Sequence, residues 1–399
     1  MNKGIVKSIL DTDLYKFTTS FGYQKLFPSA QGIFEFKDRK NTVWSEETGK
    51  KLLEALNEEL DHLQNLKLTL EERDWAIENI PFIPKYYWEW LETFRFDKSD
   101  IQFGFDEERH LFIHAGSKEK PLELYKVTLW EIAILCITTE LFGRFNGYVY
   151  DLDEVKRRLQ PKIDLSNESG ICFSEFGTRR RASFEIQRLV VEELKKKANF
   201  CTGTSNVYLA MLYGMKPMGT FPHEWPMFHG AMYRYSQANH LALEDWVKCY
   251  DGYLGIALSD TYTTDVFLKN FSKKLASLFD GVRQDSGDEF EFTEKVIARY
   301  KELGINPMTK TIIFSNALDF PKADEIRHYC SGKIRCAFGI GTNLTNDTGN
   351  PASNVVMKLM WCRMNSRDTW KPCIKLSDDL GKNMGNTAEI EHCKYELGL

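Results

Sequence analysis

The spacing of apolar residues predicts one clear helix in the first third of the chain. Within residues 46–63 the leucines recur at intervals of three and four positions, which places them on one helical face; they are Leu52, Leu53, Leu56, Leu60 and Leu63. Shorter apolar runs at 112–114 and 122–127 have the length of strands. This mixture predicts an N-terminal α/β (α+β) domain over residues 1–150, in which the helix packs against its own domain.

After residue 170 the pattern changes to an alternation of short apolar runs and helical segments. The runs cover residues 170–173, 215–219, 253–258, 281–282, 311–314, 334–338 and 373–376. An apolar stripe over 184–194 predicts a helix after the first run, and three lysines at 195–197 suit its C-terminal end. Such alternation predicts parallel strands joined by helices. We therefore expect an irregular α/β barrel, similar to a TIM barrel, of about seven parallel strands in residues 151–399. The C-terminal segment of that domain could pack back on the N-terminal domain.

Polar residues and glycines directly follow each apolar run. These segments are residues 174–181, 220–225, 259–261, 283–288, 315–319, 339–343 and 377–379. In an α/β barrel the C-terminal ends of the strands form one rim, and the active site is built there. Because the polar segments after the predicted strands would meet at this rim, Asp260, Ser315 and Asn316 are candidate substrate contacts.

Composition excludes several classes of function. With 399 residues, 43% of them hydrophobic, the chain can bury a large core. A net charge of -5 opposes general attraction to nucleic acid or to an anionic membrane, so we expect neither as a partner. The chain has no apolar run of membrane-spanning length and no secretory signal pattern, which predicts a cytoplasmic protein. Nine cysteines without a C-x-x-C pair predict reduced thiols rather than a zinc site.

Two rim segments have the features of phosphate-binding sites. Arg179, Arg180 and Arg181 follow a glycine at a strand-to-helix junction, where backbone N–H groups and arginine forks both favour an anion. A solvated basic turn is the alternative. Gly341 and Thr342 lie in a second such segment, where glycine lets the backbone approach a phosphate and threonine can donate a hydroxyl. Two such segments on one rim would suit a ligand with phosphates at both ends.

Carboxylates mark a third rim segment, residues 283–288. Arg283, Asp285 and Asp288 surround a serine and a glycine. Carboxylates in a phosphate site either bind Mg²⁺ jointly with the substrate or accept hydrogen bonds from ribose hydroxyls. A tight turn closed by an aspartate is the alternative. Mg²⁺ near Asp285 is therefore a hypothesis, and no metal ligand is assigned.

His223 is the histidine with the most reactive surroundings. It lies on a predicted rim loop between Pro222 and Glu224, and a carboxylate next in sequence can orient an imidazole if the two side chains turn toward each other. The sequence leaves three roles open for it: a structural histidine, a general acid or base, and a nucleophile or ligand.

Five segments resemble the signature segments of nicotinate phosphoribosyltransferases, and they occur in the order found in that family. They are Leu10-Asp11-Thr12-Asp13-Leu14-Tyr15-Lys16, Phe176-Gly177-Thr178-Arg179-Arg180-Arg181, Thr220-x-x-His223-Glu224-Trp225, Gly281-Val282-Arg283-x-Asp285-Ser286-Gly287-Asp288 and Cys373-Ile374-Lys375-Leu376-Ser377-Asp378. The resemblance spans nearly the whole chain. It implies a type II phosphoribosyltransferase fold, an α/β barrel joined to an N-terminal α/β domain.

The resemblance also implies an activity and roles for single residues. Nicotinate and 5-phosphoribosyl 1-pyrophosphate would form nicotinate mononucleotide for NAD biosynthesis, with Mg²⁺ as cofactor and ATP as co-substrate. His223 would be phosphorylated by ATP, with Asp285 beside it in the catalytic site. The positions that match substrate contacts are Tyr15, Arg179, Arg180, Thr220, Arg283 and Thr342. Residues 383–386 lack the acidic residue expected after Gly385. We expect a monomer or a homodimer.

Three alternative functions are compatible with the sequence. Nicotinamide or quinolinate phosphoribosyltransferase would share the fold, although the quinolinate enzyme lacks the ATP-linked histidine. A non-catalytic nucleotide or metabolite sensor would keep the phosphate site but lose His223 or Asp285. A phosphate-binding barrel lyase or isomerase would need a Schiff-base lysine or an acid/base carboxylate at a strand end, and Lys375 is the strand-end lysine that fits.

Overall fold

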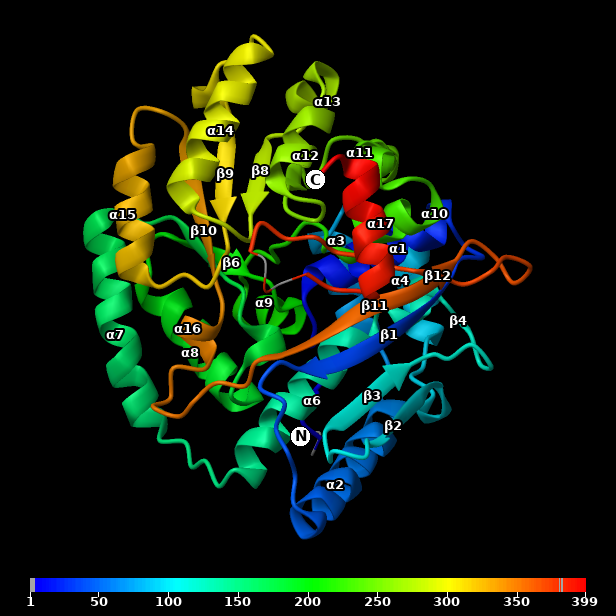
Figure 1. Ribbon diagram of the computed structural model, residues 1–399. Helices are drawn as coiled ribbons and strands as arrows, with labels where there is room; N and C mark the ends of the chain where they lie inside the picture. The colour runs from blue at the N-terminus through cyan, green and yellow to red at the C-terminus, as the bar shows by residue number, and fades with distance from the viewer. Residues whose placement is uncertain (1–3, 380, 382) are drawn as a thin grey trace.

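Two sheets organise the part of the chain that the computed structural model describes, residues 4–379, 381 and 383–399 (Figure 1). The first sheet is antiparallel and runs in the order β12-β11-β1-β3-β2, with β4 paired to β1. Its strands are β1 (Gln31–Asp38), β2 (Ile101–Phe105), β3 (Leu111–Ala115), β4 (Leu122–Glu123), β11 (Val355–Arg363) and β12 (Lys371–Pro372). The long pairing of β1 with β11 joins an early and a late segment of the chain in one sheet.

The second sheet is parallel and runs in the order β6-β5-β10-β9-β8-β7. Its strands are β5 (Phe173–Glu175), β6 (Cys201–Thr204), β7 (Ile256–Leu258), β8 (Gly281–Gln284), β9 (Thr311–Phe314) and β10 (Arg335–Ile340). Five of the seven predicted runs are confirmed as β5, β7, β8, β9 and β10. The short, polar strand β6 was not predicted from its sequence.

The remaining two runs form isolated parallel bridges at the two edges of this sheet. Pro217 pairs with Thr204 beyond β6, and Leu376 pairs with Tyr262 beyond β7. Among the described residues no recorded pairing joins these two edges, so the fold is a mixed α/β fold with one parallel and one antiparallel sheet. Closure into a barrel stays a prediction.

The helices are those that apolar spacing and capping favour. Helices α2 (Glu46–Gln64) and α8 (Phe184–Lys197) confirm the two predicted helices, and Ser45 and Ser183 accept hydrogen bonds from their first turns. The other helices are α1 (Leu14–Leu26), α3 (Leu70–Asn79), α4 (Lys85–Thr93), α6 (Trp130–Phe145), α7 (Leu152–Ser169), α9 (Val207–Tyr213), α10 (Glu224–Met232), α11 (Tyr235–Tyr250), α12 (Thr264–Asn270), α13 (Lys273–Leu278), α14 (Glu289–Glu302), α15 (Phe320–Cys330), α16 (Thr342–Thr345) and α17 (Thr387–Leu397).

The strand predicted over 122–127 is wrong beyond its second residue. Only Leu122 and Glu123 pair with β1, and α5 (Leu124–Val127) forms the rest. Leu124 and Val127 are both buried, and a separation of three residues brings them to the same side of a helical turn, whereas in a strand they would face opposite sides.

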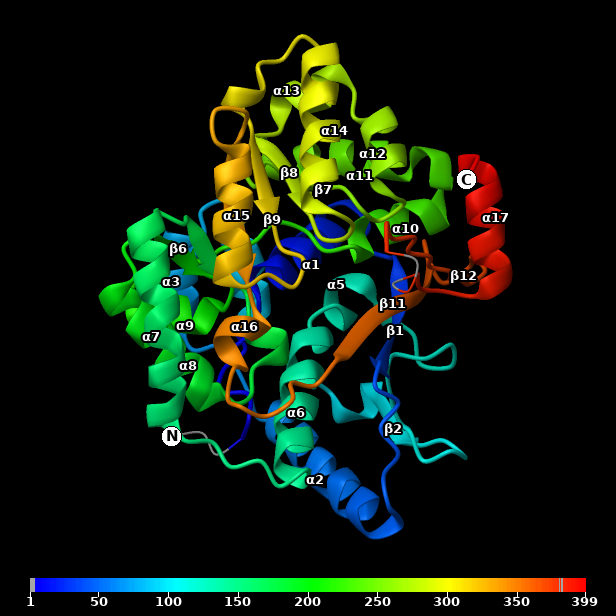
Figure 2. The same cartoon turned by 60° about the vertical axis from the view of Figure 1, so that its left-hand side comes forward.

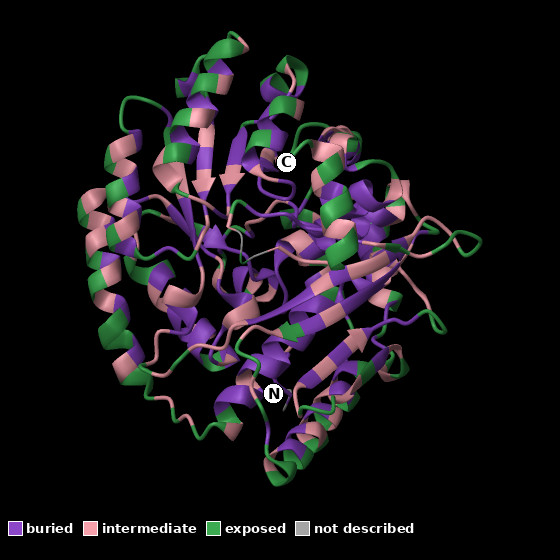
Figure 3. Ribbon diagram, viewed as in Figure 1, coloured by how far each residue is buried: buried purple, intermediate pink, exposed green. Residues whose placement is uncertain are grey.

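The arrangement of layers directs the strand ends toward the middle of the molecule. Helices α7, α14 and α15 lie along the outer side of the parallel sheet (Figures 1 and 2). Their outward faces are exposed, while the strands beneath them are largely buried (Figure 3). The C-terminal ends of β8 and β9 point toward the region crossed by β11 (Figure 1). Loops from both sheets therefore meet at the carboxyl end of the parallel strands.

Candidate active site

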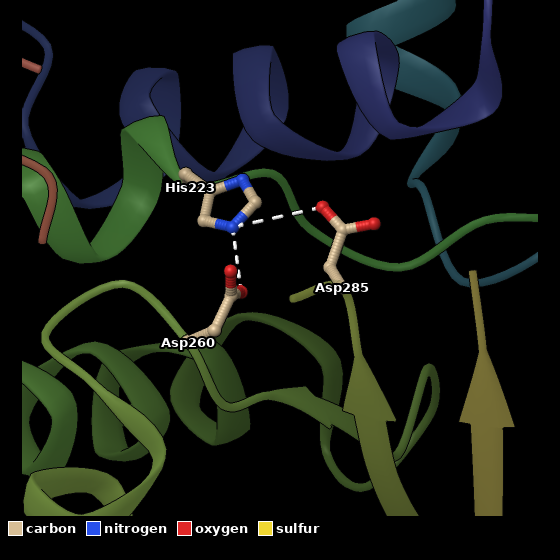
Figure 4. A group of neighbouring side chains, drawn as sticks. All are labelled: His223, Asp260 and Asp285. Atoms are coloured by element: carbon tan, nitrogen blue, oxygen red, sulfur yellow. Dashed lines mark hydrogen bonds and ion pairs between the residues drawn. The ribbon is translucent and has the colours of Figure 1, made fainter. Parts of the chain in front are cut away.

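His223 forms a cluster with two carboxylates from neighbouring strand ends (Figure 4). It immediately precedes α10 and is 6% exposed. Its Nε2 lies 2.7 Å from Asp260 Oδ1 and 3.8 Å from Asp285 Oδ2. Asp260 is the second residue after β7, and Asp285 directly follows β8. The parallel pairing of β7 with β8 thus brings together two aspartates that are distant in sequence.

Each carboxylate has a cation and a serine hydroxyl as partners. Asp260 Oδ2 accepts hydrogen bonds from Ser286 Oγ at 2.7 Å and from Lys375 Nζ at 3.0 Å. Asp285 accepts one from Ser315 Oγ at 2.9 Å, and the guanidinium of Arg283 lies 3.8 Å away. Two carboxylates and two cations therefore surround one imidazole.

The protonation state of His223 follows from burial and these neighbours. Burial lowers the pKa of His223 to about 4, against the opposing pull of Asp260. Burial also disfavours ionised Asp260, but His223, Lys375 and Ser286 hold its pKa well below the usual value. At neutral pH the imidazole is therefore neutral and Asp260 is charged. Because an ionised carboxylate can only accept a hydrogen bond, Nε2 must carry the ring proton and donate a hydrogen bond to Asp260. The other ring nitrogen, Nδ1, then has a lone pair.

The expectation that Glu224 orients His223 is wrong. The Glu224 carboxylate is buried and turned away, where it accepts hydrogen bonds from Thr128 Oγ1 at 2.6 Å and from Lys16 Nζ at 2.5 Å. Lys16 also pairs with Glu131 at 2.5 Å. The side chains of neighbouring residues at the start of a helix point in different directions, and that of Glu224 contacts Lys16, a buried lysine of α1. Glu224 therefore anchors α10 to the N-terminal region, while Asp260 orients the imidazole.

The three consecutive arginines have different environments. Thr178–Arg180 form a 3₁₀ turn after β5, and Arg181 follows it. Arg181 is fully buried and binds Asp11 through both terminal nitrogens, at 2.6 and 2.9 Å. A role for Arg181 at the rim is therefore wrong. Arg180 remains half-buried, and burial together with its neighbours Arg179 and Arg39 lowers its pKa to about 9.

Two further cations belong to this group and were not found from the sequence. Arg39 directly follows β1, and burial and Arg179 lower its pKa while Asp285 opposes them. Lys358 lies in β11, and its pKa is lowered to about 8, mainly by burial. A lysine inside an apolar strand was the available signal for Lys358; Arg39 had none. With Arg179 and Arg180 these residues form what we call the cationic cluster. Burial and like-charged neighbours disfavour the charges of Arg39, Arg180 and Lys358. Burial also opposes the charge of Arg179, but Tyr15 and acidic neighbours raise its pKa. An anion bound among these cations would stabilise the three whose charges are disfavoured.

Asp288 and the glycines of 339–341 have structural explanations. Asp288 caps α14, where its side chain accepts hydrogen bonds from the backbone N–H groups of Phe290 and Glu291 at 2.9 and 2.8 Å. The turn interpretation is therefore correct for Asp288, whereas Asp285 faces His223. A Cβ at Gly339 would lie 2.5 Å from the Phe176 ring, and one at Gly341 would lie 2.7 Å from the Phe176 carbonyl oxygen. Both glycines permit close packing of the loop after β5.

Tyr15 and Thr220 come together at the start of α1. The Thr18 hydroxyl donates to the Thr220 carbonyl oxygen at 2.9 Å and lies 3.0 Å from that of Tyr15. Within the described chain, Thr220 Oγ1 and Arg283 Nε are buried without a hydrogen-bond partner. Unpartnered buried polar atoms are costly, so both are candidates for contact with a ligand. Gly341 and Thr342 lie farther along the rim, at the start of the one-turn helix α16, and Asn316 follows β9 beside Ser315.

The His223 cluster does not fit a protein-bound Mg²⁺ ion. Its three ligand atoms lie within 4.8 Å of one another. However, the ammonium of Lys375 is 3.0 Å from Asp260 and the guanidinium of Arg283 is 3.8 Å from Asp285. Two cations already compensate the carboxylates, and Mg²⁺ prefers oxygen ligands over an imidazole.

Comparisons with known proteins agree over nearly the whole chain. Residues 171–398 match the nicotinate phosphoribosyltransferase (NAPRTase) family, and residues 10–139 match the N-terminal domain of that family. The nicotinate phosphoribosyltransferase of Chromohalobacter salexigens is 40% identical over 397 residues, 99% of each chain. That of Methanosarcina acetivorans is 38% identical over 413 residues, 99% of this chain and 98% of the other.

Solved structures of two such enzymes share the fold. The crystal structure of nicotinate phosphoribosyltransferase from Porphyromonas gingivalis superposes with a TM-score of 0.95 at 45% identity, covering 99% of this chain and 100% of that one. The enzyme from Vibrio cholerae superposes with a TM-score of 0.90 at 32% identity, covering 100% and 95%. In the described part of the chain, none of the helices combines the length and apolar character needed to cross a membrane.

Proposed function

This chain belongs to the nicotinate phosphoribosyltransferase family, and we propose that it drives that reaction with ATP through phosphorylation of His223. It is an enzyme of NAD biosynthesis that joins nicotinate to the ribose of 5-phosphoribosyl 1-pyrophosphate. The observation that carries the ATP-linked step is the neutral His223 imidazole, with Nε2 bound to Asp260 and the Nδ1 lone pair free.

Phosphoryl transfer to Nδ1 requires no base. The Nδ1 lone pair attacks the γ-phosphorus of ATP, the bond to the β,γ-bridging oxygen breaks, and ADP leaves. The proton on Nε2 stays in place, so the phosphorylated ring becomes cationic. Asp260, 2.7 Å from Nε2, stabilises that positive charge as it forms. This geometry supports a nucleophile more directly than a general base.

The transferase step needs compensation for a leaving pyrophosphate. The pyridine nitrogen of nicotinate attacks the anomeric carbon of the ribose, and pyrophosphate departs with the bonding electron pair. We assign the cationic cluster of Arg39, Arg179, Arg180 and Lys358 to the phosphate groups, because burial and like-charged neighbours disfavour the charges of Arg39, Arg180 and Lys358. Mg²⁺ would enter with the pyrophosphate group rather than as a resident ion, and we assign it no protein ligand.

Arg283 is the residue that we assign to the carboxylate of nicotinate. Its Nε is buried and unpartnered, and its guanidinium lies 3.8 Å from Asp285, too far for a hydrogen bond. Thr220 Oγ1 and Tyr15 complete the proposed nicotinate pocket. Gly341, Thr342, Ser315 and Asn316 are proposed contacts of the phosphoribosyl group along the rim. The same proposal treats the parallel sheet as an irregular barrel, an arrangement supported by the bridges that extend both sheet edges.

A substrate survey tests the proposed function. Purified protein is incubated with 5-phosphoribosyl 1-pyrophosphate and with nicotinate, nicotinamide or quinolinate, each with and without ATP. We expect turnover of nicotinate that ATP stimulates. ATP-independent turnover of equal rate would reject the coupling, and preferred turnover of nicotinamide or quinolinate would reject the substrate assignment.

Replacing Arg283 by alanine should reduce discrimination between nicotinate and nicotinamide. A carboxylate paired with a half-buried guanidinium is lost in the variant, so we expect the KM for nicotinate to rise by about 10- to 100-fold. The KM for nicotinamide should change little. The matched control is Arg335→Ala, at the opposite, N-terminal end of β10. Equal loss for both substrates would contradict the assignment.

Replacing Arg179 or Arg39 by alanine should weaken binding of 5-phosphoribosyl 1-pyrophosphate. Loss of one charged phosphate contact costs about 1.5–3 kcal/mol, which is roughly a 10- to 150-fold rise in Kd. Isothermal titration calorimetry measures the change, with nicotinate affinity as the internal reference. Thr342→Ala should weaken the same ligand less, because a neutral hydroxyl is lost. Unchanged affinity in both arginine variants would remove the cationic cluster from the phosphate site.

A further inference from the structure

Lys375 is a buried lysine of the site for which neither the nicotinate nor the phosphate assignment gives a role. Its side chain is 8% exposed, and its Nζ lies 3.0 Å from Asp260 Oδ2. The backbone fixes this contact. Leu376 N–H donates to Thr261 O at 2.8 Å, directly after Asp260 in sequence, and Lys375 and Met384 exchange two backbone hydrogen bonds of 3.0 and 2.9 Å.

Lys375 is the lysine that directly compensates the charge of the Asp260 carboxylate. The groups that face the imidazole are Asp260 from the loop after β7, Arg283 and Asp285 from β8 and its end, and Lys375 from the C-terminal segment. The positive charges of Arg39, Arg179 and Arg180 also act on Asp285, whereas Lys375 is in direct contact with Asp260. Without Lys375 the buried Asp260 carboxylate would lose its direct counter-charge, which is costly. The nearest group able to take up a proton would then be the Asp260–His223 pair.

We propose that Lys375 is a positioning residue that supplies the counter-charge of Asp260 and thereby keeps His223 neutral, with Nε2 protonated and Nδ1 free. The proposal deepens the ATP-linked function and rests on it for its purpose, phosphoryl transfer to Nδ1. The proposed effect on the charge state of the His223 ring does not depend on ATP. Lys375 acts through Asp260, whose two carboxylate oxygens contact the lysine on one side and the imidazole on the other.

Two conservative changes separate charge from shape. Lys375→Met keeps most of the side-chain volume but removes the charge, and Lys375→Arg restores a cation. The double variant Lys375→Met/Asp260→Asn removes the pair of opposite charges together while the amide oxygen of the new asparagine can still accept from Nε2. Lys310→Met is the matched control for loss of a buried lysine, because Lys310 is 8% exposed and donates to Phe279 O at 2.6 Å, away from the site.

Nitrogen NMR of the full-length protein labelled with ¹⁵N-histidine reads the ring directly at pH 7, with His223 assigned by comparison with His223→Gln. In the wild type, Lys375→Arg and Lys310→Met we expect a neutral ring protonated on Nε2. In Lys375→Met we expect proton uptake by the Asp260–His223 pair and loss of that signature. In the double variant we expect the neutral ring to return. A neutral Nε2-protonated ring in Lys375→Met would overturn the proposal.

Labelling with γ-labelled ATP adds the functional readout. Lys375→Met should lower the initial rate of label on His223 about tenfold or more at pH 7, because a protonated or flipped ring has no free lone pair on Nδ1. Lys375→Arg should recover most of the rate, whereas the double variant should remain slow, because its neutral amide cannot stabilise the positive charge of the phosphorylated ring. A wild type that takes no label would reject the ATP-linked function, whereas the NMR result would still decide the role of Lys375. Thermal unfolding of each variant verifies that it is folded.

Discussion

Replacing His223 by alanine should abolish transfer of the γ-phosphate of ATP to the protein while a slow transferase activity persists. The variant lacks the only nucleophile that we assign to this step, so labelling should fall by more than about 10³-fold. Arg283 and the cationic cluster remain, and they can still orient nicotinate and 5-phosphoribosyl 1-pyrophosphate. Turnover without ATP should therefore be measurable and no longer rise when ATP is added.

Acid-labile, base-stable label on one peptide containing His223 is the measurement for this prediction. The matched control is His229→Gln, which changes a buried histidine of α10, the helix that His223 precedes; the ring of His229 contacts Trp225 O at 2.7 Å and Asp245 at 3.0 Å. That variant should keep the label. Label that persists in His223→Ala, or that maps to another peptide, would remove His223 from the mechanism and leave it as a structural histidine.

The low pKa of His223 predicts how the rate of labelling depends on pH. The pKa of His223 lies at about 4, lowered chiefly by burial, so the ring stays neutral as pH falls from 8 to 5. Protonation of a histidine with an ordinary pKa near 6.5 would halve the rate of labelling near that pH. We expect no such loss until the pH approaches 4. A midpoint near 6.5 in the labelling rate would show that the imidazole is not in the buried environment described.

Much of the site could be predicted because parallel strands bring their C-terminal ends together. Asp260, Asp285 and Ser315 follow β7, β8 and β9, and Arg283 lies near the end of β8. These residues do meet in the cluster around His223. The apolar spacing of α2 and α8 likewise determined both helices in advance. These predictions succeeded because the spacing of apolar residues and the order of the strands and polar segments can be read directly from the sequence.

The errors concern the direction of side chains and contacts between the two sheets. Glu224 is adjacent to His223 in sequence, yet Lys16 of α1 draws its carboxylate to the other side. Arg39 and Lys358 come from the antiparallel sheet, and nothing in either segment reveals that β1 and β11 pass the ends of the parallel strands. Strand β6 is recognisable only through its pairing with β5. Such features depend on tertiary packing rather than on local pattern.

Replacing Arg181 by alanine should destabilise the fold rather than weaken a substrate. Arg181 and Asp11 are both buried, and Asp11 also accepts from Asn206 Nδ2 at 2.8 Å, so the pair ties the N-terminal segment to β5 and α9. Removing the guanidinium leaves a buried carboxylate without its counter-charge, which costs about 3–5 kcal/mol. Urea unfolding should show this loss.

The matched control for this prediction is Arg188→Ala, because Arg188 pairs with Glu185 and Glu192 at the surface and is 36% exposed. Surface pairs contribute about 0–1 kcal/mol, so that variant should unfold near the wild-type midpoint. Arg181→Leu/Asp11→Leu should recover part of the stability lost in Arg181→Ala, since no unpaired charge remains. A loss below about 1 kcal/mol for Arg181→Ala would contradict the buried pair.

Arg179→Ala has the opposite expectation, a large change in affinity for 5-phosphoribosyl 1-pyrophosphate with little change in unfolding. The two arginines, only two positions apart, would then differ in role because Arg181 binds a carboxylate of the protein and Arg179 binds the phosphates of the substrate.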